Sequence, residues 1–128
     1  MMDRAESGDN DDSSAMLVRL SDVRQGRQPT IVGFARRELE QILHLYGMMV
    51  AANEWRDYAI DHLSDRAVFS VYRRASETPL FQIVKTPALA RRQGAWAIIG
   101  ANGAVLKRGH ELPRVLTVFD KKLRLVSD

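Results

Sequence analysis

The chain has 128 residues, no cysteine and a formal net charge of +3, and this length supports one domain with a core of its own. The lack of cysteine excludes a disulfide framework, a cysteine-ligated metal site and cysteine catalysis. No apolar run approaches the ~20 residues that cross a bilayer, and the acidic, polar N-terminus is unlike a secretory signal. We therefore expect a cytoplasmic protein that has no membrane partner.

Charge is unevenly distributed along the chain. Residues 1–15 carry five acidic side chains and one arginine, a net charge of −4, which leaves +7 for residues 16–128. The first segment has no hydrophobic pattern and is rich in Asp, Ser and Gly, so it cannot offset the entropy lost on ordering. We expect 1–15 to be a disordered acidic tail and 16–128 to be a single domain. The tail either screens a basic surface or aids solubility.

The first long periodic pattern predicts a helix from Phe34 to about Ala52. Its apolar residues fall at helical spacing and form one stripe: Leu39, Ile42, Leu43, Tyr46, Met49 and Val50. A helix of nineteen residues is about 28 Å long, and Asn53 is a residue type that ends helices. The short run Thr30-Ile31-Val32 before the helix predicts an edge strand.

From Trp55 onwards the hydrophobic period changes to two, which predicts β-strands. The runs with this pattern are 55–61, 67–74, 79–86, 95–99 and 104–108, and up to two further short strands follow within 114–126. Asn102-Gly103 supplies the positive φ angles of a tight hairpin. Because short turns separate neighbouring runs, we expect an antiparallel meander.

These elements predict an α+β fold, in which one long amphipathic helix packs on a twisted, mostly antiparallel sheet of five to seven strands. A helix with a single apolar stripe must bury that stripe, and the sheet is its candidate partner. The other face of the sheet is then solvated, closed by curling into a half-barrel, or used to form a homodimer.

Basic residues stand beside the predicted turns. If successive strands are antiparallel, loop 62–66, segment 87–94 and the chain after residue 108 meet at one end of the sheet. The residues gathered there form a candidate anion-binding site, comprising His62, Arg66, Arg91, Arg92, Lys107, Arg108 and His110, with Lys85 nearby. Arginine offers a bidentate fork to phosphate or carboxylate, while Gly94 and Gly109 allow backbone N–H groups to approach.

The partner of such a site is a nucleic acid, a phosphorylated ligand or an acidic protein surface. Nucleic-acid binding also needs exposed aromatic side chains for base stacking, and aromatic residues at strand spacing are more often buried. The sequence has no recognisable nucleic-acid-binding motif. The alternative is that these cations are solvated or paired with Asp61, Asp65 and Glu111. The Arg73-Arg74 doublet falls at the opposite end of the sheet, beside Trp55.

The sequence carries no signature of catalysis or of a cofactor. There is no Gly-x-Ser-x-Gly elbow and no phosphate-binding glycine loop, and the histidines are too scattered for a metal triad to be argued. The alternative to a binding module is a small enzyme that uses Asp57, Asp61 and His62 for acid–base chemistry. Ion pairing of these aspartates on an exposed sheet face is the simpler interpretation, so we expect a binding module rather than an enzyme.

Several strings in the chain resemble a known family. They include Arg37-Glu38-Leu39 with Tyr46-Gly47, EWRDYAID at 54–61, AVFSVYRR at 67–74, PLFQIVKTP at 79–87, LARRQGAW at 89–96 and LKRGH at 106–110. Over residues 34–126 the chain is similar to a small family of alphaproteobacterial proteins grouped only as a domain of unknown function. The resemblance implies a bacterial, cytoplasmic, single-domain protein. It implies no activity, cofactor or catalytic residue.

Overall fold

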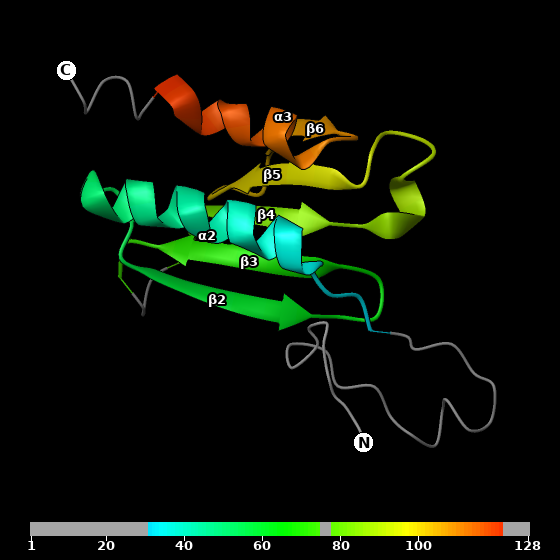
Figure 1. Ribbon diagram of the computed structural model, residues 1–128, viewed down its shortest axis with the longest axis horizontal. Helices are drawn as coiled ribbons and strands as arrows, with labels where there is room; N and C mark the ends of the chain where they lie inside the picture. Colours follow the sequence, from blue (N-terminus) through cyan, green and yellow to red (C-terminus); the bar gives the residue numbers. More distant parts are fainter. Residues whose placement is uncertain (1–30, 75–77, 122–128) are drawn as a thin grey trace.

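The computed structural model describes residues 31–74 and 78–121, so the predicted acidic tail lies outside the described residues. The elements follow in chain order (Figure 1): α2 Arg36–Ala51, β2 Asp57–His62, β3 Ala67–Tyr72, β4 Phe81–Lys85, η3 Pro87–Leu89, β5 Trp96–Gly100, β6 Val105–Gly109, α3 Leu112–Leu116 and η4 Thr117–Phe119. The described part is thus an α+β fold. No helix within it combines the length and the hydropathy needed to cross a bilayer.

The five strands form one antiparallel sheet, in which every strand pairs with its neighbours in the sequence, in the order β2-β3-β4-β5-β6. The predicted meander is confirmed. The β5–β6 hairpin turns where predicted, and the Gly103 N–H donates to the Gly100 carbonyl over 2.9 Å. Of the two predicted turn residues, only Gly103 takes a positive φ, of 85°, because Asn102 acts instead through its side chain, which accepts from the Ala104 N–H at 3.1 Å.

Helix α2 is shorter than predicted. It covers 16 residues instead of nineteen and is about 24 Å long. The helix starts late because Ala35 is extended and Phe34 turns into the core, where its ring stacks on Trp96 at a centroid distance of 6.1 Å. The helix ends before Asn53, as predicted, and Asn53 follows in the left-handed conformation with φ of 63°.

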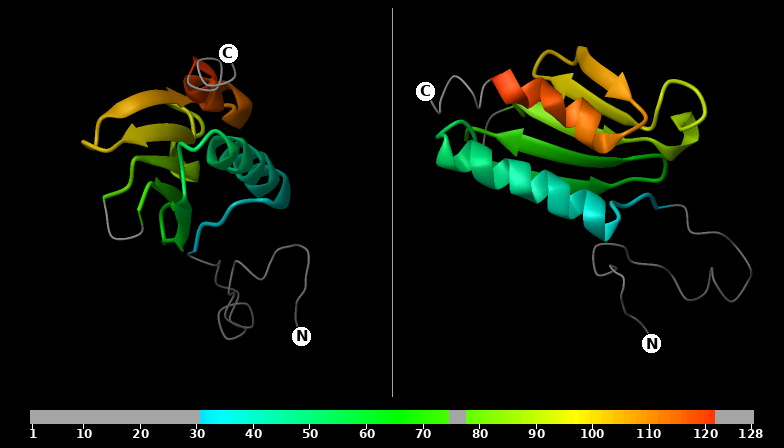
Figure 2. Two further views of the ribbon diagram at one scale, coloured as in Figure 1. Left: turned by 90° about the vertical axis from the view of Figure 1, so that its left-hand side faces the viewer. Right: turned by 45° about the horizontal axis from the view of Figure 1, so that its top comes forward.

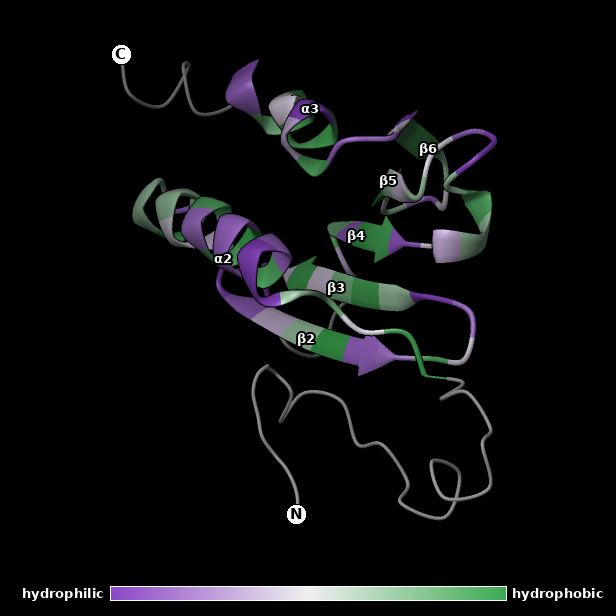
Figure 3. Cartoon of the chain, turned by 45° about the vertical axis from the view of Figure 1, so that its right-hand side comes forward, coloured by the Kyte–Doolittle hydropathy of each residue, from purple (hydrophilic) through white to green (hydrophobic). Residues whose placement is uncertain are grey.

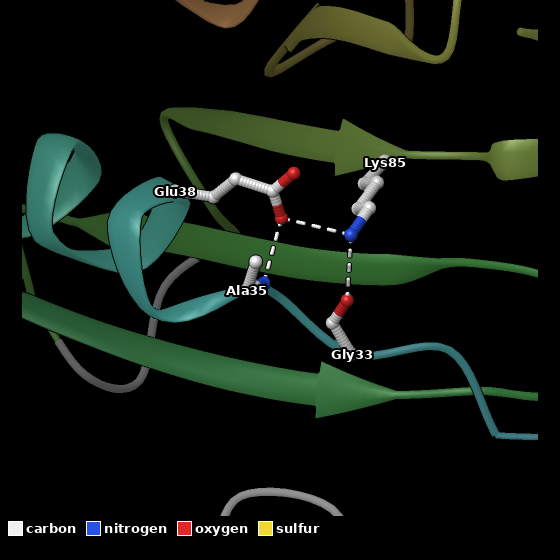
Figure 4. Close-up of polar contacts among 4 residues, drawn as sticks. All are labelled: Gly33, Ala35, Glu38 and Lys85. Carbon is white, nitrogen blue, oxygen red and sulfur yellow. Dashed lines mark hydrogen bonds and ion pairs between the residues drawn. The ribbon is translucent and has the colours of Figure 1, made fainter. Parts of the chain in front are cut away.

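The first turn of α2 is anchored to the sheet by a small polar network (Figure 4). Glu38 Oε1 accepts a hydrogen bond from the Ala35 N–H at 2.7 Å and another from Lys85 Nζ at 2.8 Å. Lys85 Nζ also donates to the Gly33 carbonyl at 3.0 Å. One carboxylate therefore caps the helix and neutralises the lysine at the end of β4.

The core lies between α2 and one face of the sheet (Figure 2). Phe69, Ile83 and Ile98 stand side by side on β3, β4 and β5 and are fully buried. The apolar residues are concentrated in the central strands, while the first turn of α2 is hydrophilic (Figure 3). The stripe on α2 is narrower than predicted, because Leu43 and Val50 are 36% and 40% exposed.

The predicted strands within 114–126 are wrong for the residues that the structure describes, because α3 and η4 occupy 112–119. Leu112, Val115 and Phe119 are buried, and their spacing of three and then four residues is helical. The Phe119 ring meets Trp55 and Phe81 edge-on, at centroid distances of 5.1 and 5.0 Å. The sheet therefore has five strands in the described part of the chain, and a second short helix completes the core.

The predicted edge strand at Thr30-Ile31-Val32 is also wrong where it can be followed. Thr30 lies outside the described residues, and Ile31 and Val32 have no strand structure. The Val32 N–H nevertheless donates to the Leu63 carbonyl at 2.8 Å. This hydrogen bond holds the segment that leads into α2 against the loop that follows β2.

Candidate functional site

The meander brings the predicted basic segments to one end of the sheet (Figure 1). Loop 62–66, the connection from β4 to β5 and the chain after Gly109 all leave the strands on the same side. The end is wide, however. His62 on β2 and Arg108 on β6 are four strand spacings apart, about 19 Å at the usual 4.8 Å per spacing. The predicted site residues therefore separate into two groups.

The first group consists of His62, whose ring is partly buried, and Arg66, whose guanidinium is paired with a neighbouring carboxylate. Both Asp65 carboxylate oxygens accept hydrogen bonds from Arg66, at 3.0 and 3.1 Å. The His62 ring packs edge-on to Phe34 at a centroid distance of 6.4 Å, and its buried Nε2 has no hydrogen-bond partner among the described residues. Burial lowers the pKa of His62, against the opposing effect of the Asp61 charge.

Three residues of the second group, Lys107, Arg108 and His110, border an open cavity of about 470 Å³ where β6 turns into α3. Its lining consists of Lys107, Arg108, Gly109, His110, Glu111, Arg114 and Val115. Strand β6 is an edge strand among the described strands, where it pairs only with β5. Because successive side chains of a strand point to opposite faces, an edge position is what allows both Lys107 and Arg108 to border one cavity.

Positive charge exceeds negative charge around this cavity. Its one carboxylate, Glu111, lies 3.5 Å from Arg114 Nε, in a pair whose side chains are 69% and 83% exposed. Exposed pairs of this kind contribute little. Lys107 Nζ donates to the Thr117 hydroxyl at 3.3 Å, and no carboxylate within residues 31–74 and 78–121 pairs with Lys107 or Arg108. Two uncompensated cations therefore remain at the cavity.

His110 joins the cavity to the loop that carries the Arg91-Arg92 doublet. Its Nδ1 lies 3.0 Å from the Ala90 carbonyl, and a carbonyl oxygen can only accept, so we assign the ring hydrogen to Nδ1. Nε2 is then the ring nitrogen left for a ligand. Arg91 and Arg92 follow Ala90 directly and are exposed. They stand beside the cavity and do not line it.

The two glycines act differently from the prediction. Gly94 has φ of +106°, and a Cβ placed on it would lie 2.2 Å from the Gly109 carbonyl carbon and oxygen. The backbones of the β4–β5 connection and the end of β6 are therefore in direct contact. The absence of side chains allows the two backbone segments to pack, which positions His110 beside Ala90.

Sequence reasoning missed two cations. Arg114 falls within a predicted strand, although the spacing of Leu112, Val115 and Phe119 indicates a helix that brings it to the cavity. Arg56 carried no signal in the sequence, yet it joins the Arg73-Arg74 doublet in a separate cavity at the opposite end of the sheet.

The residues of the acid–base alternative do not face one another. Asp57 and Asp61 are exposed and alternate with the residues that face α2, whereas His62 lies on the face that α2 covers, against Phe34. Within the described ranges, no three His, Cys, Asp or Glu side chains are grouped so that they could hold a metal ion.

No curated protein and no solved structure matches the chain. A family model described as "Protein of unknown function (DUF2794)" matches residues 32–116. The predicted resemblance to a domain of unknown function is confirmed by this match, while an alphaproteobacterial origin stays a prediction. Since the match covers more than half of the 128 residues, the chain belongs to the DUF2794 family.

Proposed function

We propose that the protein is a binding module that holds a phosphorylated small ligand in the cavity between β6 and α3. The observation that carries the proposal is the excess of cations around a cavity of about 470 Å³. This volume falls within the roughly 300–1,000 Å³ that is usual for small-molecule sites. The cationic side chains that line the cavity carry both positive charge and hydrogen-bond donors, so they favour a ligand with an anionic group.

Each side chain has a distinct role in this proposal. Arg108 is partly buried and supplies a planar fork for two phosphate oxygens. Lys107 supplies a point charge, and His110 supplies Nε2 as a donor or acceptor because Nδ1 is already engaged by Ala90. Arg91 and Arg92 raise the local positive potential and attract the anion.

A phosphorylated ligand is favoured over a nucleic acid because of where the aromatic side chains lie. Trp96 is 5% exposed and Phe81 packs on the core. Tyr58 is 46% exposed, but it lies on β2, at the other edge of the sheet. Stacking on exposed rings is a main source of affinity for single strands, and the described residues at the cavity include no Phe, Tyr or Trp side chain.

The test is a titration of the full chain with inorganic pyrophosphate, followed by calorimetry and by backbone amide shifts. Lys107→Ala with Arg108→Ala is expected to weaken binding at least tenfold, with shifts in the wild type centred on 107–114. Arg36→Ala with Arg37→Ala is the matched control, since it removes the same charge from the exposed first turn of α2. It is expected to change the affinity less than twofold.

Two outcomes would overturn the proposal. One is the absence of saturable pyrophosphate binding by the wild type. The other is an equal loss of affinity in both double variants, which would show a response to net charge alone. A single-stranded oligonucleotide provides the comparison for nucleic acid: if it binds more tightly than pyrophosphate, with an affinity that falls steeply with salt, the nucleic-acid alternative replaces the small ligand.

A further inference from the structure

We infer that a second and separate anion site, for a single phosphate group, lies at the opposite end of the sheet and is formed by Arg56, Arg73 and Arg74 with Asn53. These four residues line an open cavity of about 270 Å³. The cavity lies where α2 ends, β2 begins and β3 ends, away from the β6–α3 cavity (Figure 1). It is independent of the proposed function.

The hydrogen bonding beside the strand ends brings two of these arginines to one cavity. Asp57 pairs with Tyr72, and the Arg56 N–H donates to the Tyr72 carbonyl at 2.8 Å. Arg56 is therefore held beside the end of β3, where Arg73 follows Tyr72 directly, and both arginines line the cavity. Like charges that share a cavity repel each other. A bound anion would convert this repulsion into attraction.

The backbone that carries Arg56 is fixed on both sides. Besides its N–H bond, its carbonyl accepts a hydrogen bond from the Tyr46 hydroxyl at 2.7 Å. Burial raises the pKa of Tyr46 above its ordinary value, as do the Asp57 charge and Tyr58 to a smaller extent, so the hydroxyl keeps its proton over a wide pH range. Asn53, with its left-handed φ of 63°, turns the chain from α2 towards β2. The frame is therefore preorganised, which reduces the ordering cost of binding.

Positive charge at this cavity is only partly compensated. Glu54 Oε1 lies 3.9 Å from the Arg73 guanidinium, and the Arg73 side chain is 55% exposed. Among the residues that the structure describes, no carboxylate pairs with Arg56 or Arg74. Even when Glu54 is counted fully against Arg73, two cations remain for a ligand.

Size and donor geometry define the class of ligand. The volume of about 270 Å³ lies below the ~300 Å³ at which small-molecule sites usually begin, so a phosphate group with few attached atoms fits best. Guanidinium groups bind oxyanions through paired N–H donors, which a halide cannot match. The ligand is inorganic phosphate or the phosphate end of a phosphomonoester.

The experiment is a titration of the full ¹⁵N-labelled chain with inorganic phosphate at constant ionic strength, with chloride as the reference anion. Saturable amide shifts are expected at Asn53, Arg56, Arg73 and Arg74. Arg56→Ala with Arg74→Ala is expected to weaken phosphate binding at these amides at least tenfold. Arg56→Lys with Arg74→Lys keeps the charge but loses the paired guanidinium donors, so it is expected to weaken binding less than the alanine variant does. Arg36→Ala with Arg37→Ala, on the exposed first turn of α2, is the matched control and is expected to change phosphate binding at these amides less than twofold.

Three results would overturn the inference. Shifts that stay linear in phosphate would show that no site exists, and equal weakening by the control would show a response to net charge. A lower melting temperature of Arg56→Ala with Arg74→Ala, at unchanged phosphate affinity, would show that these arginines only stabilise the end of α2. Pyrophosphate binding at 107–114 is read from different amides in the same spectra, so each site can fail without the other.

Discussion

Lys85 Nζ lies 2.8 Å from Glu38 Oε1, and this contact ties the end of β4 to the first turn of α2 across 47 positions of the sequence. The two side chains are 19% and 27% exposed, so water screens them less than it screens a surface pair. Lys85 also lies 5.9 Å from the centre of the Trp96 ring. The contact therefore joins the polar anchor of α2 to the aromatic stack beneath it.

Replacing Lys85 by Met is expected to lower the free energy of unfolding by about 1.5–3 kcal/mol, the usual range for a hydrogen bond to a charged group. The variant leaves Glu38 partly buried with the Ala35 N–H as its remaining partner. Chemical denaturation measures the loss, and a double-mutant cycle with Glu38→Gln isolates the pair. Arg36→Ala with Glu40→Ala is the control: this exposed pair at 3.4 Å should contribute no more than about 0.5 kcal/mol. A cycle that returns no coupling would contradict the assignment.

Two glycine-to-alanine substitutions are expected to have opposite signs. Gly94→Ala forces a Cβ to within 2.2 Å of the Gly109 backbone at a positive φ, so it should destabilise by about 3 kcal/mol or more, from strain and overpacking together. Gly47→Ala in α2 meets nothing within 4 Å and should stabilise by about 1 kcal/mol, because alanine is the better helix former. Melting temperatures of the two variants are the measurement. Equal effects would mean that the Gly94–Gly109 contact is not rigid.

Stability should depend on pH through His62. Its pKa is lowered in the folded state from its ordinary value of 6.5, so the unfolded chain binds the proton more readily. The contribution of His62 to the free energy of unfolding is then fully present above pH 6.5. It decreases as pH falls through that value, and the decrease levels off below the folded-state pKa. Urea midpoints between pH 7.5 and 5 measure the slope.

His62→Gln is expected to reduce that slope, and His44→Gln, at an exposed position on α2, is expected to leave it unchanged. If both variants keep the wild-type slope, the acid sensitivity belongs to another group.

The C-terminal helical segment is expected to be part of the core and not an appendage. Phe119 is 1% exposed, so Phe119→Ala should cost about 3–5 kcal/mol, as is usual for removing a buried ring. Val105→Thr on β6, where the side chain is 51% exposed, should stay within about 0.5 kcal/mol. Thermal unfolding compares the two variants. A small loss for Phe119→Ala would indicate that the Trp55–Phe81 cluster closes without it.

The strands of the meander could be predicted because period-two alternation and short turns are local properties. The segment after residue 111 could not be placed as easily. Its apolar residues Val115, Leu116, Val118 and Phe119 fit short strands as well as a helix, and only burial of Leu112, Val115 and Phe119 on one side decides between them. Pro113 at the start of a helix supports the same conclusion.

The gathering of basic residues at one end of the sheet could be predicted, but which of them border one cavity could not. The antiparallel order alone places Lys107, Arg108 and His110 at the same end as Arg91 and Arg92. Some cations at this end are already paired with carboxylates and so are less available to a ligand. Which ones are paired depends on contacts between distant residues, such as the ion pair of Lys85 with Glu38. The arginine cavity at the other end joins Arg56, from a separate segment, to the Arg73-Arg74 doublet, which a list of basic doublets does not reveal.

The meander has a consequence for how the chain reaches its folded state. Each strand pairs with the next in sequence, so most of the sheet assembles by closing short loops, and such local topologies fold faster than those built on distant pairings. The stack of Phe34 on Trp96 joins residues far apart in the chain. We expect the hairpins to form early and α2 to dock only once β5 is in place.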